Sequence, residues 1–104
     1  MKRSFIAVAF IVGSGLAAGS VKLAWDDNST NEDTFRIERK EGSGSFVEIK
    51  SVPANTTTFE DVDAKYGVPY EYRVRAHNTA GFSDYSNTAS TTLTLGQVKN
   101  IRLR

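Results

Sequence analysis

From Val21 onward, apolar and polar residues alternate over short stretches, and the spacing of an amphipathic helix is absent. In "VKLAW", for example, Val21, Leu23 and Trp25 alternate with Lys22 and Ala24. Clusters such as "DDNSTNED" and "EGSGS" favour turns and separate one alternating stretch from the next. The pattern predicts short β-strands joined by turns, at residues 21–25, 34–40, 46–52, 56–61, 70–78 and 88–95.

The clearest of these strands is "YEYRVRAHN", which follows Pro69. Proline at the start of a strand does little harm, because its missing N–H is not needed there. One face of the strand carries Tyr70, Tyr72, Val74 and Ala76, and the other carries Glu71, Arg73, Arg75 and His77. One apolar and one polar face indicate a strand that covers a core on one side only. Such strands without helices predict an all-β sandwich of two antiparallel sheets.

The stretches "VKLAWDDNSTNEDTFRIERK" and "YEYRVRAHNTAGFSDYSN" resemble the fibronectin type III domain, in its bacterial and phage versions. The resemblance covers Val21 to about Leu93 and implies an immunoglobulin-like sandwich, with strands A, B and E in one sheet and C′, C, F and G in the other. It also implies a set of core residues, namely Trp25 in strand B, Phe35 and Ile37 in strand C, and Tyr70, Tyr72 and Val74 in strand F. Tyr70 matches the tyrosine of the E–F corner, so we expect a buried ring whose hydroxyl reaches a backbone partner.

The first twenty residues have the three parts of a secretory signal peptide. "MKR" is positively charged, "FIAVAFIV" (residues 5–12) is apolar, and the small residues around Ala18 suit a signal peptidase. The apolar stretch is shorter than the ~20 residues that a transmembrane helix needs. We therefore predict a leader at residues 1–19 and a sandwich domain at residues 20–95. A buried β-strand is the alternative interpretation, because β-branched residues and phenylalanine are frequent in strands.

The chain departs from the family pattern at its N-terminal strand. The family begins with a strand A, whereas strand B here follows directly after the predicted leader, so the domain's own strand A is apparently missing. At the other end, residues 96–104 ("GQVKNIRLR") form a basic strand or tail that resembles the strand A of a following domain.

A sandwich without strand A exposes the edge of strand B, and open edges recruit strands. The C-terminal segment offers Val98, Ile101 and Leu103 as a candidate strand-donor interface. Its charged residues are all basic, whereas residues 21–95 carry a net charge of −4. These features suggest the hypothesis that the segment inserts into the next molecule as a donated strand, which would give head-to-tail assembly into a filament or a ring. In the competing interpretation it is the stub of a second domain.

Composition excludes several classes of function. Thirteen basic residues balance twelve acidic ones, so we expect no nucleic-acid partner held by bulk charge. There is no cysteine, which excludes disulfides, thiol chemistry and a lipid anchor on cysteine. Arginines on the predicted strands C and F alternate with Glu38 and Glu71, and this favours a mixed cross-strand charge ladder over a basic patch.

No residue pattern predicts catalysis, a cofactor or a bound metal. His77 is the only histidine, and an isolated histidine on an outer face is usually a solvated surface residue. Acidic residues crowd the loop from Asp26 to Asp33, where turn capping is favoured over calcium binding because the spacing is not that of an EF-hand.

The sequence therefore predicts a non-catalytic structural or adhesive module, secreted or at the cell surface, without a membrane span in its mature form. Its partner would be another protein, either a second copy or a surface component. Two alternatives stay open. In the first, the protein is a decoration or tail domain of a phage virion, with the N-terminal apolar run retained and buried. In the second, it is an accessory domain of a carbohydrate-active enzyme.

Overall fold

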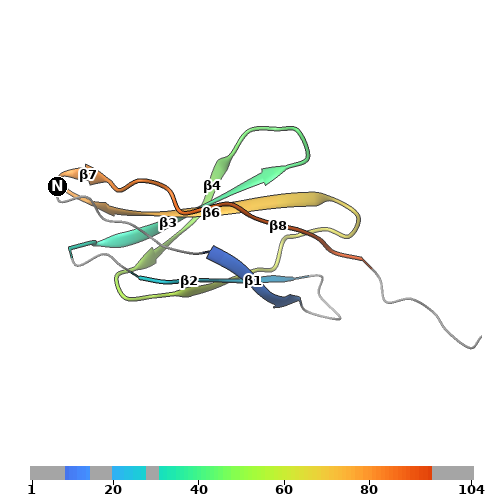
Figure 1. Cartoon of the computed structure of the whole chain (residues 1–104), viewed down its shortest axis with the longest axis horizontal. Coiled ribbons are helices and arrows are strands. Elements are labelled where there is room, and N and C mark those ends of the chain that lie inside the picture. Colours follow the sequence, from blue (N-terminus) through green and yellow to red (C-terminus); the bar gives the residue numbers. More distant parts are fainter. Residues whose placement is uncertain (1–8, 15–19, 28–30, 95–104) are drawn as a thin grey trace, which may run out of the picture.

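The computed structural model describes residues 9–14, 20–27 and 31–94, and in these ranges the chain forms eight strands and no helix (Figure 1). Accordingly, no helix in this part of the chain is long and apolar enough to cross a membrane. The strands are β1 (Ala9–Ser14), β2 (Val21–Trp25), β3 (Thr34–Glu41), β4 (Val47–Pro53), β5 (Thr58–Asp61), β6 (Pro69–Asn78), β7 (Gly81–Phe82) and β8 (Ala89–Thr92).

The strands form two antiparallel sheets that pack face to face. The smaller sheet has the order β1-β2-β5. The larger has the order β4-β3-β6-β7, and β8 also pairs with β6. The prediction of an all-β sandwich of antiparallel sheets is therefore confirmed.

The expectation that the sandwich lacks its first strand is wrong for this chain. β1 pairs with β2 from Ala9 opposite Trp25 to Ser14 opposite Val21, with an irregularity between Ile11 and Gly13. Residues 9–14 thus occupy the edge position that was expected to be empty. The physical reason lies in "AFIVGS", whose β-branched and aromatic residues suit a strand as well as they suit a leader. Removal of residues 1–19 as a leader stays a prediction.

The core lies between the sheets, where the inward residues of each strand meet. Trp25, Phe35, Ile37, Tyr70, Tyr72 and Val74 all lie in it, each no more than 3% exposed. The rings of Trp25 and Phe35 meet edge to face with centroids 5.7 Å apart. The Tyr70 hydroxyl accepts a 2.9 Å hydrogen bond from the backbone N–H of Lys65, so this ring is tied to the loop that precedes its own strand.

The segment after β6 is more ordered than the loop expected there. Gly81 and Phe82 form β7, paired with Asn78 and His77, and Gly81 has a φ of 132°, which favours glycine. The following strand is shorter than expected and ends at Thr92. Beyond it the Leu93 carbonyl accepts a 2.8 Å hydrogen bond from the Gly67 N–H, which fixes where β8 leaves the sandwich.

Replacing Trp25 by alanine should destabilise the domain far more than replacing an exposed charge. Truncating a buried aromatic residue costs ~3–5 kcal/mol, because the transfer free energy is lost and a cavity remains. The exposed Lys50 provides the control, and its replacement by alanine should cost no more than ~0.5 kcal/mol. Urea unfolding measures both variants, and equal midpoints would contradict the placement of Trp25 in the core.

Candidate functional site

The outer face of the larger sheet carries a group of charged side chains that contact one another. β3 and β6 pair in one regular register, in which Arg36 lies opposite Arg75 and Glu38 lies opposite Arg73. Because side chains of facing residues point to the same side of a sheet, these four lie together on the outside. Their charges interleave, as the sequence predicted for this face.

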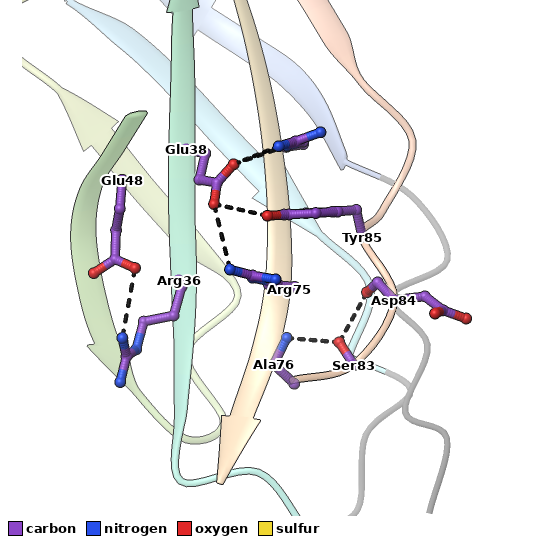
Figure 2. A network of polar contacts seen from close by, with 9 residues as sticks. Arg36, Glu38, Glu48, Arg75, Ala76, Ser83, Asp84 and Tyr85 are labelled. Carbon is purple, nitrogen blue, oxygen red and sulfur yellow. Dashed lines mark hydrogen bonds and ion pairs between the residues drawn. The ribbon is translucent and has the colours of Figure 1, made fainter. Parts of the chain in front are cut away.

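Glu38 is the centre of this group, and it is only 7% exposed although it lies on the outer face. Its carboxylate accepts hydrogen bonds from Arg73 Nε at 2.9 Å and from the Tyr85 hydroxyl at 2.9 Å. A terminal nitrogen of Arg73 lies 2.8 Å from the carboxylate. One of Arg75 lies 3.7 Å away, and Figure 2 shows Arg75 and Tyr85 both directed at Glu38. Two guanidinium groups and one phenol thus cover a single carboxylate.

Aromatic rings cover the faces of the same guanidinium groups. The Arg73 guanidinium lies 3.9 Å from the centroid of Phe46 and 3.6 Å from that of Tyr85. The Arg75 guanidinium lies 4.5 Å from Tyr85 and 3.6 Å from Phe82. Ring and cation therefore alternate along the sheet. We call this set the cation–aromatic ladder; its members are Phe46, Arg73, Tyr85, Arg75, Phe82 and the central Glu38.

Two serines hold the ladder's outer rings in place. Ser83 and Ser86 accept hydrogen bonds through their hydroxyls from the backbone N–H groups of Ala76 and Val74, at 2.8 and 3.0 Å. Their own N–H groups donate to the carbonyls of the same two residues, at 2.9 and 2.8 Å. The segment from Phe82 to Ser86 is thereby fastened along β6, and Figure 2 shows Ser83 between Ala76 and Asp84.

The charged groups of the ladder contact one another, and one of its buried donors, Arg75 Nε, has no hydrogen-bond partner among the described residues. Burial raises the pKa of the Tyr85 phenol, and its hydrogen bond to Glu38 raises it further, so the phenol is a donor rather than an anion. Each charged group faces an opposite charge or an aromatic ring. With two guanidinium groups and one carboxylate the ladder has a net charge of +1, and its mutual contacts suit a rigid surface.

A second carboxylate network lies under the opposite side of the same sheet. Asp61, 3% exposed, accepts hydrogen bonds from the Tyr72 hydroxyl at 2.7 Å and from Arg39 at 2.8 Å. Burial and the Asp61 contact both raise the pKa of Tyr72. Burial is the largest single effect on the pKa of Arg39 and lowers it, but the hydrogen bond to Asp61 and the Coulombic effects of Asp61, Tyr72 and Tyr70 together outweigh burial and leave the pKa raised.

The Asp61 network lies beside a groove between β4 and β5, with a volume of about 440 Å³. Ile49 and Phe59 line it together with Arg39 and Asp61. Arg39 and Asp61 are paired with each other, but Lys50, Glu60 and Asp63 also line the groove, so it is a charged groove.

The structure places the remaining sequence candidates as follows. His77 lies at the end of the ladder, with Nδ1 3.3 Å from an Arg36 nitrogen and its ring on Phe82. In the acidic loop, Glu32 accepts a hydrogen bond from the Asn55 N–H at 3.4 Å. The described residues contain no group of histidines and carboxylates that could hold a metal ion. Val98, Ile101 and Leu103 lie outside the described residues.

The aromatic half of the ladder was not predicted from the sequence. Residues 79–87 were expected to form a plain loop, and no contact between Phe46 and β6 was expected. A signal was present in "FSDYS", where an aromatic–serine pair recurs after three residues. That spacing puts both rings over the sheet and both hydroxyls on the backbone of β6.

Two antiparallel sheets, with a buried tyrosine bonded to the preceding loop, define an immunoglobulin-like β-sandwich. Within that class the chain belongs to the fibronectin type III family: the model of the fibronectin type III domain matches residues 9–92. The match includes β1, and the resemblance drawn from the sequence is confirmed.

Solved structures agree on the fold. An Fn3-like protein from Clostridium thermocellum superposes with a TM-score of 0.72 at 17% identity, over 96% of this chain and 100% of that one. The twitchin kinase region from C. elegans gives 0.75 at 20% identity, over 98% of this chain. Pectate lyase PelI from Erwinia chrysanthemi, in complex with tetragalacturonic acid, gives 0.70 at 20% identity, over 86% of this chain. The chain spans only 18% of the twitchin structure and 28% of the pectate lyase.

Removing the central carboxylate should weaken the ladder. We expect Glu38→Ala to lower the free energy of unfolding by ~1–3 kcal/mol, because it leaves two partly buried guanidinium groups without their acceptor. The matched control is Glu48→Ala on the neighbouring strand, whose carboxylate lies 3.5 Å from Arg36 and is 41% exposed. This control should cost less than ~1 kcal/mol. Chemical unfolding at low salt measures both, and equal losses would show that Glu38 is an ordinary surface charge.

The Asp61 network should make the domain sensitive to alkali. The pKa of Tyr72 is raised above the ordinary value of 10.0, so above pH 10.0 the unfolded chain releases this proton while the folded chain keeps it. The titration of Tyr72 should therefore leave the free energy of unfolding unchanged below that pH and lower it as the pH rises beyond it. Tyr72→Phe should cost ~1–3 kcal/mol at neutral pH and flatten the alkaline slope. An unchanged slope would contradict the assignment.

Proposed function

We propose that this protein is a non-catalytic fibronectin type III module that acts outside the cytoplasm as a structural or adhesive unit. The observation that carries this proposal is the ladder. Its two guanidinium groups contact one carboxylate and the aromatic rings, so the ladder is rigid and has a net charge of only +1. The three-part leader pattern in residues 1–19 supports export.

The partner in this proposal is another protein, a second copy of this chain among the candidates. A rigid sheet with aromatic rings and arginines resembles the cores of protein interfaces, which are enriched in both residue types. The balanced charge gives no reason to expect nucleic acid.

A second candidate is an accessory role within a larger protein. The observation that favours it is that this chain matches small parts of the twitchin kinase and pectate lyase structures. Under this alternative the domain would position a neighbouring unit and have no activity of its own. A virion component is the third candidate, and it differs from the first in retaining its N-terminal residues.

The N-terminus of the exported protein decides between secretion and retention. Expressed in a secretion-competent bacterial host, the protein should be recovered outside the cytoplasm with a first residue near Ser20, as read by N-terminal sequencing and intact mass. A variant with Lys2 and Arg3 replaced by glutamate should lose export, because it lacks the positive start of a leader. Recovery of an intact Met1 inside the cell would overturn the proposal of secretion and favour the virion candidate.

A further inference from the structure

Residues 9–14 belong to two overlapping features. In the sequence they fall inside the predicted leader, and in the fold they are the edge strand β1. If the leader is removed, as the proposed function requires, β1 leaves with it. The backbone edge of β2 from Val21 to Trp25 then loses the strand that covers it.

The uncovered edge would tend to pair with another strand. Val21, Leu23 and Trp25 of β2 are at most 3% exposed in the complete sandwich. β1 is the outer strand on this side and also approaches β8 of the opposite sheet. Without it, unpaired N–H and C=O groups would lie beside apolar side chains, a combination that recruits another strand.

We propose that residues 98–104 of a second copy occupy this edge in the mature protein, antiparallel to β2. The inference rests on the proposed function, because it needs the leader to be removed. The segment has the apolar spacing that the site needs: Ile101 and Leu103 are two residues apart, as are Trp25 and Leu23. Pairing Ile101 with Trp25 and Leu103 with Leu23 directs both apolar side chains towards the core and turns Arg102 outward, opposite Ala24.

Charge favours the same occupant. The segment contains Lys99, Arg102 and Arg104 and no acid, whereas residues 21–95 contain twelve acidic and eight basic residues. The proposed register places Arg104 opposite Lys22, whose neighbour on β5 is Glu60, so the attraction is to the acidic body as a whole rather than to a single partner. It adds to the main-chain hydrogen bonds that a donated strand supplies.

Strand direction identifies the donor as another molecule. The Trp25 N–H donates to the Thr57 carbonyl and the Asp33 carbonyl accepts from the Ala54 N–H, so the end of β2 and the start of β3 both lie at the turn between β4 and β5, and the two strands run in opposite directions along the sandwich. β1 is antiparallel to β2, and β8 follows the direction of β3 because both are antiparallel to β6. β1 and β8 therefore run the same way. A chain that leaves β8 already runs in the direction of β1. It leaves, however, at the end of the sandwich where β2 begins, whereas a strand antiparallel to β2 has to begin at the other end, beside Trp25.

If the segment paired with β2 of its own molecule, it would use most of its residues to reach the Trp25 end of that strand. It would first have to travel back along β2, about 17 Å at ~3.3 Å per residue, and then turn again. That path places Ile101 in the return and the second turn rather than beside Trp25. A second copy placed end to end receives the segment in the right direction at once. The contact is head-to-tail, so repetition gives a filament or a ring.

Three chains test assembly by light scattering after size exclusion. Residues 20–104 should form assemblies that grow with concentration. The uncleaved chain 1–104 should stay monomeric because β1 covers the edge. Residues 20–95 should be monomeric and unfold at lower urea than 1–104. If residues 20–104 stay monomeric at high concentration, the inference is overturned and the proposal of secretion is unaffected. If the exported protein retains Met1, the proposal of secretion is overturned, and the scattering of residues 20–104 still decides whether the segment can assemble the domain.

Cysteine cross-linking tests the register and the donor, since the chain contains no cysteine of its own. In the 20–104 background, mixing an Ala24→Cys chain with an Arg102→Cys chain should give disulfide-linked dimers on oxidation. The off-register mixture of Ala24→Cys with Asn100→Cys should give at least several-fold fewer. Equal yields would overturn the register. A chain carrying both Ala24→Cys and Arg102→Cys that closes its disulfide within one molecule would overturn donation between copies.

Discussion

The register in which β3 pairs with β6 determines most of what this molecule presents on either side. With Ile37 opposite Val74, the inward faces of both strands supply the centre of the core, and with Glu38 opposite Arg73 the outward faces supply the ladder. A slip by one residue would exchange the two faces, burying the charges and exposing the apolar residues. One pairing therefore fixes the core and the outer surface together. The smaller sheet, β4 and the Phe82–Ser86 segment all pack against the β3–β6 pair.

Each side of that sheet contains one buried carboxylate, and the two are held in the same way. Glu38 accepts from Arg73 and Tyr85 on the outside, and Asp61 accepts from Arg39 and Tyr72 on the inside. Buried ion pairs contribute little net stability, because desolvation offsets much of their attraction, but breaking one is costly. Their effect here is to penalise alternative arrangements: the Glu38 contacts join β3, β6 and the segment after β7, and the Asp61 contacts join β5 to the larger sheet.

The strands and the core could be predicted from the sequence because alternation is a local signal. The two-residue spacing of Tyr70, Tyr72 and Val74 is enough to place them on one face of a strand. The Asp61 network and the ladder were not readable in the same way. Asp61 and Arg39 are 22 residues apart, and only the packing of β5 against β3 brings them together. Phe46 likewise reaches Arg73 across a hairpin. The N-terminal strand was only the alternative interpretation of residues 5–12, because one apolar run fits both a leader and a strand and the sequence does not distinguish them.

The parallel course of β1 and β8 also determines how the domain would carry a mechanical load. β1 starts at the end of the sandwich where Trp25 lies, and β8 finishes at the opposite end, beside Gly67. Tension applied through the two ends of the chain therefore runs along the strands. The β1–β2 and β6–β8 ladders would be loaded in shear, so that their hydrogen bonds resist together instead of opening one after another. A row of such domains joined end to end would transmit force along the same axis in every unit.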